Sequence, residues 1–173
     1  AENRPAPAGL LWPDWDNPVA FVPVDGGEVV SPDGTSRENP TEVSWVLKIV
    51  EDLLEAGELT KKDIGIITPY AGQVRAIRNS MSEQLDDIEV RTVDGYQGRE
   101  KEIIIFSCVR SNPEKNVGFL ADSRRLNVAL TRAKRGLIVI GDPTTLRSDK
   151  NWQAWLEYIR NSKFEAWHLL GMA

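Results

Sequence analysis

Short apolar runs alternate with amphipathic stretches along most of the chain. Five stretches with continuous or alternating apolar residues predict strands, at residues 19–24, 64–68, 88–93, 102–109 and 137–141. Between and after them, apolar residues recur at helical spacing following Asn39, around Val74 and Ile77, and from Trp152 to Ile159. Strands that alternate with helices, and that are apolar without interruption, indicate a mostly parallel sheet covered on both faces. The pattern therefore predicts an α/β domain.

Local residue types predict where several of these elements begin and end. Asn39 and Pro40 suit the N-cap and the first position of a helix, and Gly57 is expected to end that helix. Asp142 is expected to act as a cap or turn residue before Pro143. The segment at residues 25–37 contains three glycines and a proline, so it predicts turns.

One basic stretch, residues 122–136, has the spacing of an amphipathic helix. Its cap is expected at Asp122 and its end at Gly136, and Arg125 and Arg132 then share one flank. No acidic residue follows Asp122 within the stretch, so the helix presents guanidinium groups in fixed directions, as a phosphate site requires. A solvated basic face is the alternative. The residues expected on the core side are Leu126, Ala129, Leu130 and Ala133.

Short polar and aromatic side chains follow two of the predicted strands. Thr68, Pro69 and Tyr70 end one strand, and Thr92 ends the next. Because parallel strands finish at one edge of a sheet, hydroxyl and backbone amide groups there suit contacts with phosphates, which position a nucleic acid without reading its sequence. Tyr70 suits two roles equally, stacking on a base or capping the edge of the core.

Composition narrows the function classes. The 173 residues, 41% hydrophobic and 27% charged, suit one globular domain, and no apolar run approaches the ~18 residues of a membrane span. A single cysteine rules out an internal disulfide and fits a reducing intracellular compartment, cytoplasmic or nuclear, and a single histidine disfavours a zinc site. The net charge of −5 argues against tight independent binding to nucleic acid. A local basic cluster still acts within about 10 Å at 0.1 M salt.

Three strings of residues resemble the late motifs of superfamily 1 helicases. They are residues 64–73 (IGIITPYAGQ), 93–102 (VDGYQGREKE) and 124–133 (RRLNVALTRA). Their order and spacing match the group that contains the nonsense-mediated-decay helicase, senataxin and the immunoglobulin mu-binding helicase. The resemblance implies the second RecA-like domain of such a helicase, a three-layer α/β fold. We expect that domain at residues 19–162, an irregular Pro/Trp arm at residues 1–18 and a tail at residues 163–173.

The same resemblance implies roles for individual residues. Arg132 is expected to be catalytic and to reach the γ-phosphate of ATP, where such an arginine is worth roughly 10³ to 10⁵ in rate. Glu100 is expected to accept a hydrogen bond from the ribose, with Gly98 allowing close approach of the backbone. Arg125 either supports Arg132 or is structural, and both alternatives stay open. The residues expected at the nucleic acid are Thr68, Pro69, Tyr70, Thr92 and Asn127. For Asn127 a contact with the charged cluster at residues 92–101 is the open alternative.

The implied ligands are ATP with Mg, bound mainly by a first RecA-like domain, and single-stranded RNA or DNA tracked from 5′ to 3′. The phosphate loop GxxxxGK[ST] does not occur in these 173 residues, so the chain alone is not expected to hydrolyse ATP. Two other functions stay open. One is a stand-alone, non-catalytic RecA-like module that binds nucleic acid or protein; the other, less favoured, is a metabolic enzyme that binds a phosphorylated small molecule. A Walker motif encoded upstream of Ala1 would distinguish the helicase from the module.

Overall fold

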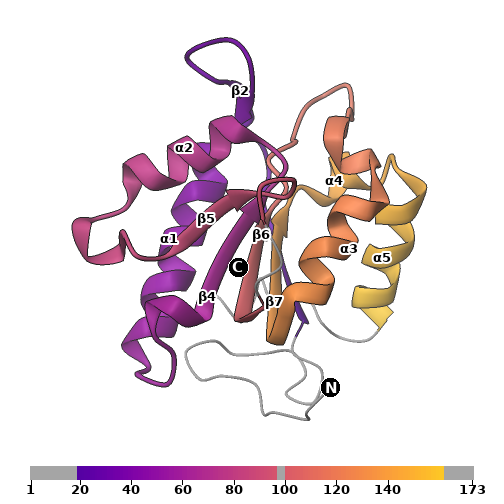
Figure 1. Ribbon diagram of the computed structural model, residues 1–173. Helices are drawn as coiled ribbons and strands as arrows, with labels where there is room; N and C mark the ends of the chain where they lie inside the picture. Colours follow the sequence, from indigo (N-terminus) through magenta and orange to yellow (C-terminus); the bar gives the residue numbers. More distant parts are fainter. Residues whose placement is uncertain (1–18, 97–99, 162–173) are drawn as a thin grey trace.

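A five-stranded parallel sheet with helices on both faces forms the domain (Figure 1). The computed structural model describes residues 19–96 and 100–161, so the predicted arm and tail lie outside the described residues. Each pair of neighbouring strands in this sheet is parallel. The predicted α/β, RecA-like class is confirmed. In spatial order the strands are β1 (Val19–Pro23), β7 (Ala133–Gly141), β6 (Lys101–Ser107), β4 (Ile64–Thr68) and β5 (Glu89–Thr92).

Two apolar layers, one on each face of the sheet, hold the helices in place. Helices α1 (Pro40–Glu55) and α2 (Ala71–Ser80) cover one face, and α3 (Ser123–Arg132), α4 (Pro143–Leu146) and α5 (Lys150–Asn161) belong to the other side (Figure 1). Strand β6 supplies both layers, since Ile103 and Ile105 face α1 while Ile104 and Phe106 face the opposite layer. Each such fully buried side chain stabilises the fold by roughly 1.5–3 kcal/mol.

The predicted helix signals at Asn39 and Asp142 are confirmed. The Asn39 side chain accepts a hydrogen bond from the backbone N–H of Glu42 at 3.1 Å, and Pro40 begins α1. The Asp142 carboxylate accepts from the N–H of Thr144 at 2.9 Å and caps α4. Each cap satisfies a backbone donor that the first turn of a helix leaves without an intrahelical partner.

The expected end of the basic helix at Gly136 is wrong. Helix α3 ends at Arg132, and β7 begins at the next residue, where Ala133 pairs with Lys101 of β6. Hydrogen bonding to β6 extends the strand four residues further toward the N-terminus than its apolar run indicates, and Gly136 lies buried within it. Ala133, expected on the core side of the helix, is therefore a strand residue.

The segment predicted as turns contains a small hairpin. Strands β2 (Val29–Val30) and β3 (Arg37–Glu38) pair antiparallel there, with Val30 opposite Arg37. Three short 3₁₀ turns complete the described chain: η1 (Lys61–Asp63), η2 (Glu83–Leu85) and η3 (Gly118–Ala121). No helix among the described residues is long and apolar enough to cross a membrane.

The turn η3 is anchored against the helical layer by Trp152 of α5. The Trp152 side chain is 1% exposed, and its indole N–H donates to the backbone carbonyl of Leu120 at 2.9 Å. Its ring also lies 6.4 Å from that of Phe106 and 5.7 Å from that of Trp155, centroid to centroid. The loop that carries η3 is thereby tied to the core.

Candidate functional site

Glu100 and Arg132 each lie immediately before one of two adjacent strands, at the edge of the sheet where the strands begin. Because Lys101 pairs with Ala133, the residues immediately before them lie at the starts of adjacent strands. The Glu100 side chain is 56% exposed, with Lys134 Nζ 3.9 Å from one carboxylate oxygen. Two residues that the sequence places far apart in the chain therefore share one end of the molecule.

Arg132 is half-buried, and its side chain carries an unsatisfied donor. The Nε atom is buried and has no hydrogen-bond partner among the described residues. Buried donors without a partner are uncommon in folded proteins, and their explanations include strain, a catalytic role and a bound water or ion. Of the other two predicted nucleotide contacts, Gly98 lies outside the described residues, and Arg125 lies in α3 with its side chain outside the described part.

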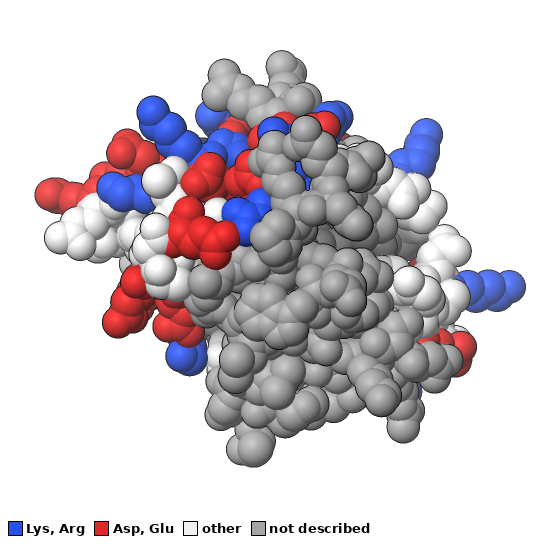
Figure 2. All heavy atoms as spheres, turned by 90° about the horizontal axis from the view of Figure 1, so that it is seen from below, with Lys and Arg blue, Asp and Glu red and all other residues white. Residues whose placement is uncertain are grey.

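The surface at this end of the molecule has mixed charge. Seen from below, acidic and basic side chains of the described residues lie intermixed (Figure 2). Such mixing agrees with the net charge of −5.

The predicted nucleic-acid residues gather at the opposite edge, where the strands end. Thr68 of β4 pairs with Thr92 of β5, so these two residues are neighbours. Thr68, Pro69 and Tyr70 are buried, whereas Thr92 is half-buried and its hydroxyl accepts from the N–H of Gly95 at 3.1 Å. The fifth predicted residue, Asn127, is exposed on α3. The structure thus brings four of the five together at one edge.

A groove lined by arginines runs beside Thr92. It has a volume of about 270 Å³, lies between α2 and β5, and continues past Gly95 toward a larger hollow of about 1080 Å³. Both hollows are open at the surface. The basic residues that line the smaller one are Arg75, Arg78 and Arg91.

Tyr70 is tied into the edge of the core. Its side chain is 4% exposed, and its hydroxyl oxygen accepts from Arg110 Nη1 at 3.1 Å and from the N–H of Phe119 at 3.2 Å. Of the two roles that the sequence left open, capping the core edge agrees with this burial. A direct contact between Tyr70 and a base stays a prediction.

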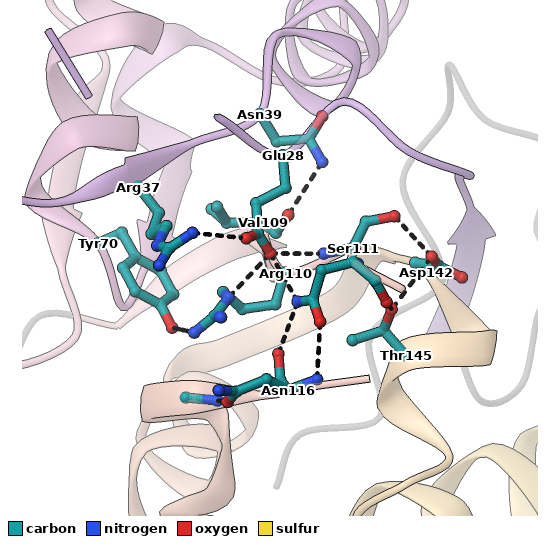
Figure 3. A network of polar contacts seen from close by, with 12 residues as sticks. Glu28, Arg37, Asn39, Tyr70, Val109, Arg110, Ser111, Asn116, Asp142 and Thr145 are labelled. Atoms are coloured by element: carbon teal, nitrogen blue, oxygen red, sulfur yellow. Dashed lines mark hydrogen bonds and ion pairs between the residues drawn. The ribbon is translucent and has the colours of Figure 1, made fainter. Parts of the chain in front are cut away.

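A buried ion pair that the sequence analysis missed holds this edge together (Figure 3). Glu28 accepts from Arg110 Nε at 2.8 Å, from the N–H of Ser111 at 2.9 Å and from the Asn112 side chain at 3.0 Å. Burial acts to raise the pKa of Glu28, but these hydrogen bonds and the charge of Arg110 outweigh it and hold that pKa below its ordinary value. Arg37 Nη1 completes the group, 3.0 Å from the second carboxylate oxygen.

A second buried carboxyl, Glu42, lies under the same edge. It is fully buried in α1 and accepts from the Ser107 hydroxyl at 2.7 Å and from the N–H of Val109 at 3.0 Å. Burial raises the pKa of Glu42 to about 8, more than these hydrogen bonds lower it. Val109 has a φ of 72°, an uncommon value for a β-branched residue, and its carbonyl accepts from the Asn39 side chain at 2.9 Å. Glu42 and Asn39 together hold this strained turn.

Replacing Glu42 with glutamine should change how stability depends on pH. Because its pKa is about 8 in the folded state and 4.5 ordinarily, the folded state binds more protons between these values. The stability contributed by the protonated carboxyl is full below pH 4.5 and is lost as the pH rises through about 8. We expect the free energy of unfolding to fall over this window by up to about 1.4 kcal/mol per pH unit relative to Glu42→Gln.

Urea unfolding of both proteins at a series of pH values measures this difference. Glu51→Gln, at an exposed position of the same helix, is the matched control and should follow the wild type. Parallel pH profiles for the wild type and Glu42→Gln would contradict the assigned protonation of Glu42.

The five-stranded parallel sheet with helices on both faces is the architecture of a RecA-like domain. A family model described as "AAA domain" matches residues 1–144, and the chain belongs to this family. The resemblance to superfamily 1 helicases, first read from three motifs, is confirmed by the curated relatives described next.

Three relatives show what the chain is similar to. It is 43% identical over 170 residues to "Regulator of nonsense transcripts 1 homolog" of Drosophila melanogaster, a match covering 94% of this chain and 14% of the relative. It is 47% identical over 148 residues to an ATP-dependent helicase of Schizosaccharomyces pombe, covering 82% and 16%. It is 45% identical over 148 residues to an uncharacterized ATP-dependent helicase of Methanocaldococcus jannaschii, covering 86% and 21%. The chain thus spans about a fifth or less of the length of these relatives.

Proposed function

We propose that this chain is the second RecA-like domain, residues 19–162, of a longer ATP-dependent helicase that moves 5′ to 3′ on single-stranded RNA or DNA. The observation that carries the proposal is that Glu100 and Arg132 immediately precede the paired first residues of β6 and β7, and that the Arg132 Nε has no partner among the described residues. The relatives named above as ATP-dependent helicases support the activity.

The residues present fit one side of a nucleotide. Arg132 would place its guanidinium against the γ-phosphate and stabilise the charge that develops there, and Glu100 would accept a hydrogen bond from a ribose hydroxyl. When bound, Mg²⁺ would neutralise charge on the phosphates. No group of three or more His, Cys, Asp or Glu side chains that could hold a metal ion occurs in the part of the chain that the structure describes. We therefore assign the metal and most of the triphosphate to a first RecA-like domain.

A single strand would lie across the other edge of the sheet. Thr68 and Thr92 are neighbours there, and the arginine-lined groove beside Thr92 offers cationic contacts to phosphates. The single-stranded nucleic acid would bind at one edge of the sheet and the nucleotide at the other. This arrangement agrees with a motor in which closing of the cleft between two domains moves the nucleic acid. The single cysteine, Cys108, is buried and unpaired, and we place the protein inside the cell, in the cytoplasm or nucleus.

The native gene and its product test this proposal directly. The helicase reading requires that GxxxxGK[ST] and an Asp-Glu pair be encoded upstream of residue 1, and that the product hydrolyse ATP faster when single strands are present. Hydrolysis is expected from the longer protein and not from these 173 residues alone. A reading frame without those motifs would support the stand-alone module instead.

Replacing Thr92 with valine should weaken binding of a single strand by about threefold to tenfold, equally for different base sequences. The change keeps the shape of the side chain and removes one hydroxyl, which corresponds to a hydrogen bond of about 0.5–1.5 kcal/mol. Fluorescence anisotropy with labelled homopolymers measures it in the full-length protein. Thr41→Val, exposed on α1, is the control. A loss confined to one base sequence would contradict a backbone contact.

A further inference from the structure

One aromatic side chain at the strand-end edge is open to solvent. Phe119, in η3, is 54% exposed, whereas its neighbour Leu120 is 3% exposed and packed in the core. The Phe119 ring is stacked on that of Tyr70, with centroids 5.2 Å apart and planes 25° apart. A single exposed aromatic side chain is common on protein surfaces and needs no explanation by itself. The feature that distinguishes Phe119 is the stack on Tyr70, which holds its ring in a fixed orientation.

The residues beneath Phe119 are Tyr70, Arg110 and Glu28, which form a buried mounting that contains an ion pair. The Tyr70 hydroxyl oxygen accepts a hydrogen bond from Arg110 Nη1. The guanidinium carbon of Arg110 lies 5.8 Å from the centroid of the Tyr70 ring. Arg110 is itself fixed by Glu28, and the side chains of both are at most 8% exposed. The stack therefore rests on groups that cannot rearrange without breaking a buried ion pair.

Gly118 allows the backbone next to Phe119 to approach Arg110 and Tyr70 closely. Its φ is 52°, in the left-handed region that glycine tolerates best. A Cβ at this position would overlap the Arg110 guanidinium and lie 2.5 Å from the Tyr70 hydroxyl oxygen. Only the absence of a side chain lets the backbone lie flat against the pair, so that the N–H of Phe119 reaches Tyr70 and the ring settles on it.

We propose that Phe119 is a stacking platform for a base of the single strand, an inference that rests on the function proposed above. Every base has a π face, so an aromatic ring held at fixed height accepts any of them, as a protein that moves along a strand requires. The platform lies over Tyr70, which directly follows the strand end that carries Thr68. In this assignment Tyr70, Arg110 and Glu28 are positioning residues that support Phe119.

The test is strand binding by the full-length protein with Phe119→Ala, Phe119→Trp and Gly118→Ala. We expect Phe119→Ala to weaken binding about tenfold for all homopolymers, since stacking of one base contributes on that order. Phe119→Trp should retain the wild-type affinity for single strands. The affinity of Gly118→Ala should fall toward that of Phe119→Ala. Tyr158→Ala is the matched control, because Tyr158 is an aromatic residue of similar exposure, 55%, on a different element, α5, and this variant should bind as the wild type does.

A base analogue separates stacking from a purely structural effect. One 2-aminopurine is moved along a short strand, and quenching of its fluorescence reports an aromatic neighbour. We expect one position to be quenched by the wild type and by Phe119→Trp but not by Phe119→Ala, at unchanged thermal midpoint. Equal affinity and equal quenching for wild type and Phe119→Ala would overturn the platform while the helicase function stands, and would point to a protein partner for the ring. A wild-type protein that binds no strand would overturn both.

Discussion

Replacing Arg132 with alanine in the full-length protein is expected to lower ATP turnover by about 10³- to 10⁵-fold while the domain stays folded. The expectation follows from the charge that builds on the γ-phosphate oxygens, which a guanidinium inserted from a second domain stabilises. The structure is favourable to such a role, because Arg132 is half-buried at the end of α3 and its Nε lacks a partner among the described residues. Steady-state hydrolysis in saturating single strand gives kcat, and thermal unfolding reports the fold.

Two variants sharpen this measurement. Arg132→Lys keeps the charge but loses the planar fork of donors, so most of the loss should persist. Arg124→Ala removes a guanidinium from the other end of α3, where the side chain is 89% exposed beside Asp122, and turnover should stay near the wild-type value. Unchanged turnover in Arg132→Ala would remove its catalytic assignment. An equal loss in Arg124→Ala would indicate a general charge effect of the helix.

Replacing Glu28 with alanine is expected to destabilise the domain by about 3–5 kcal/mol. The change leaves the Arg110 guanidinium buried without its carboxylate, a situation far costlier than losing an exposed pair. It also removes the acceptor of Ser111 and Asn112. Chemical denaturation of the 173-residue chain measures the difference, with Asp52→Ala as the control. Asp52 pairs with Lys48 at 3.3 Å on an exposed face, so its loss should cost less than about 1 kcal/mol.

A double-mutant cycle isolates the pair itself. Glu28→Ala combined with Arg110→Ala should destabilise much less than the sum of the two single changes, because the second removes the charge that the first left unpaired. Additive losses would mean that each residue acts through separate contacts, and the supporting role assigned to the pair beneath Tyr70 would fail.

The strands of the sheet and the main helices could be predicted from the local pattern of apolar residues and helix caps. Apolar runs as continuous as residues 103–106 have one stable environment, a strand covered on both faces, and Asn39 and Asp142 act within three residues of themselves. The end of α3 did not follow. Arg132, Ala133 and Lys134 suit a helix by residue type, and only pairing with β6 makes the last two a strand.

The residues of the candidate site likewise include some that the sequence indicated and some that it did not. The proximity of Glu100 and Arg132 in the fold could be expected, because the motif that contains each residue precedes an apolar run. The pairing of Lys101 with Ala133 places both residues at the same edge of the sheet. The partnership of Glu28 with Arg110 spans 82 residues and leaves no periodic signal in either segment. The polar run at residues 110–112 directly after a buried strand was the only hint. Exposure of Phe119 depends on Gly118 and on the anchor at Trp152, neither of which a local pattern shows.

The absence of any turn between α3 and β7 has a mechanical consequence. Arg132 is the last residue of the helix, and Ala133 already pairs with Lys101 of β6. Because no loop separates the two elements, this pair ties the helix end directly to β6, and we expect the backbone that carries the guanidinium to move with the sheet. If Arg132 engages a nucleotide as proposed, the distance from its guanidinium to the phosphate would depend on the orientation of the domain, and a small rotation between two lobes would change that distance.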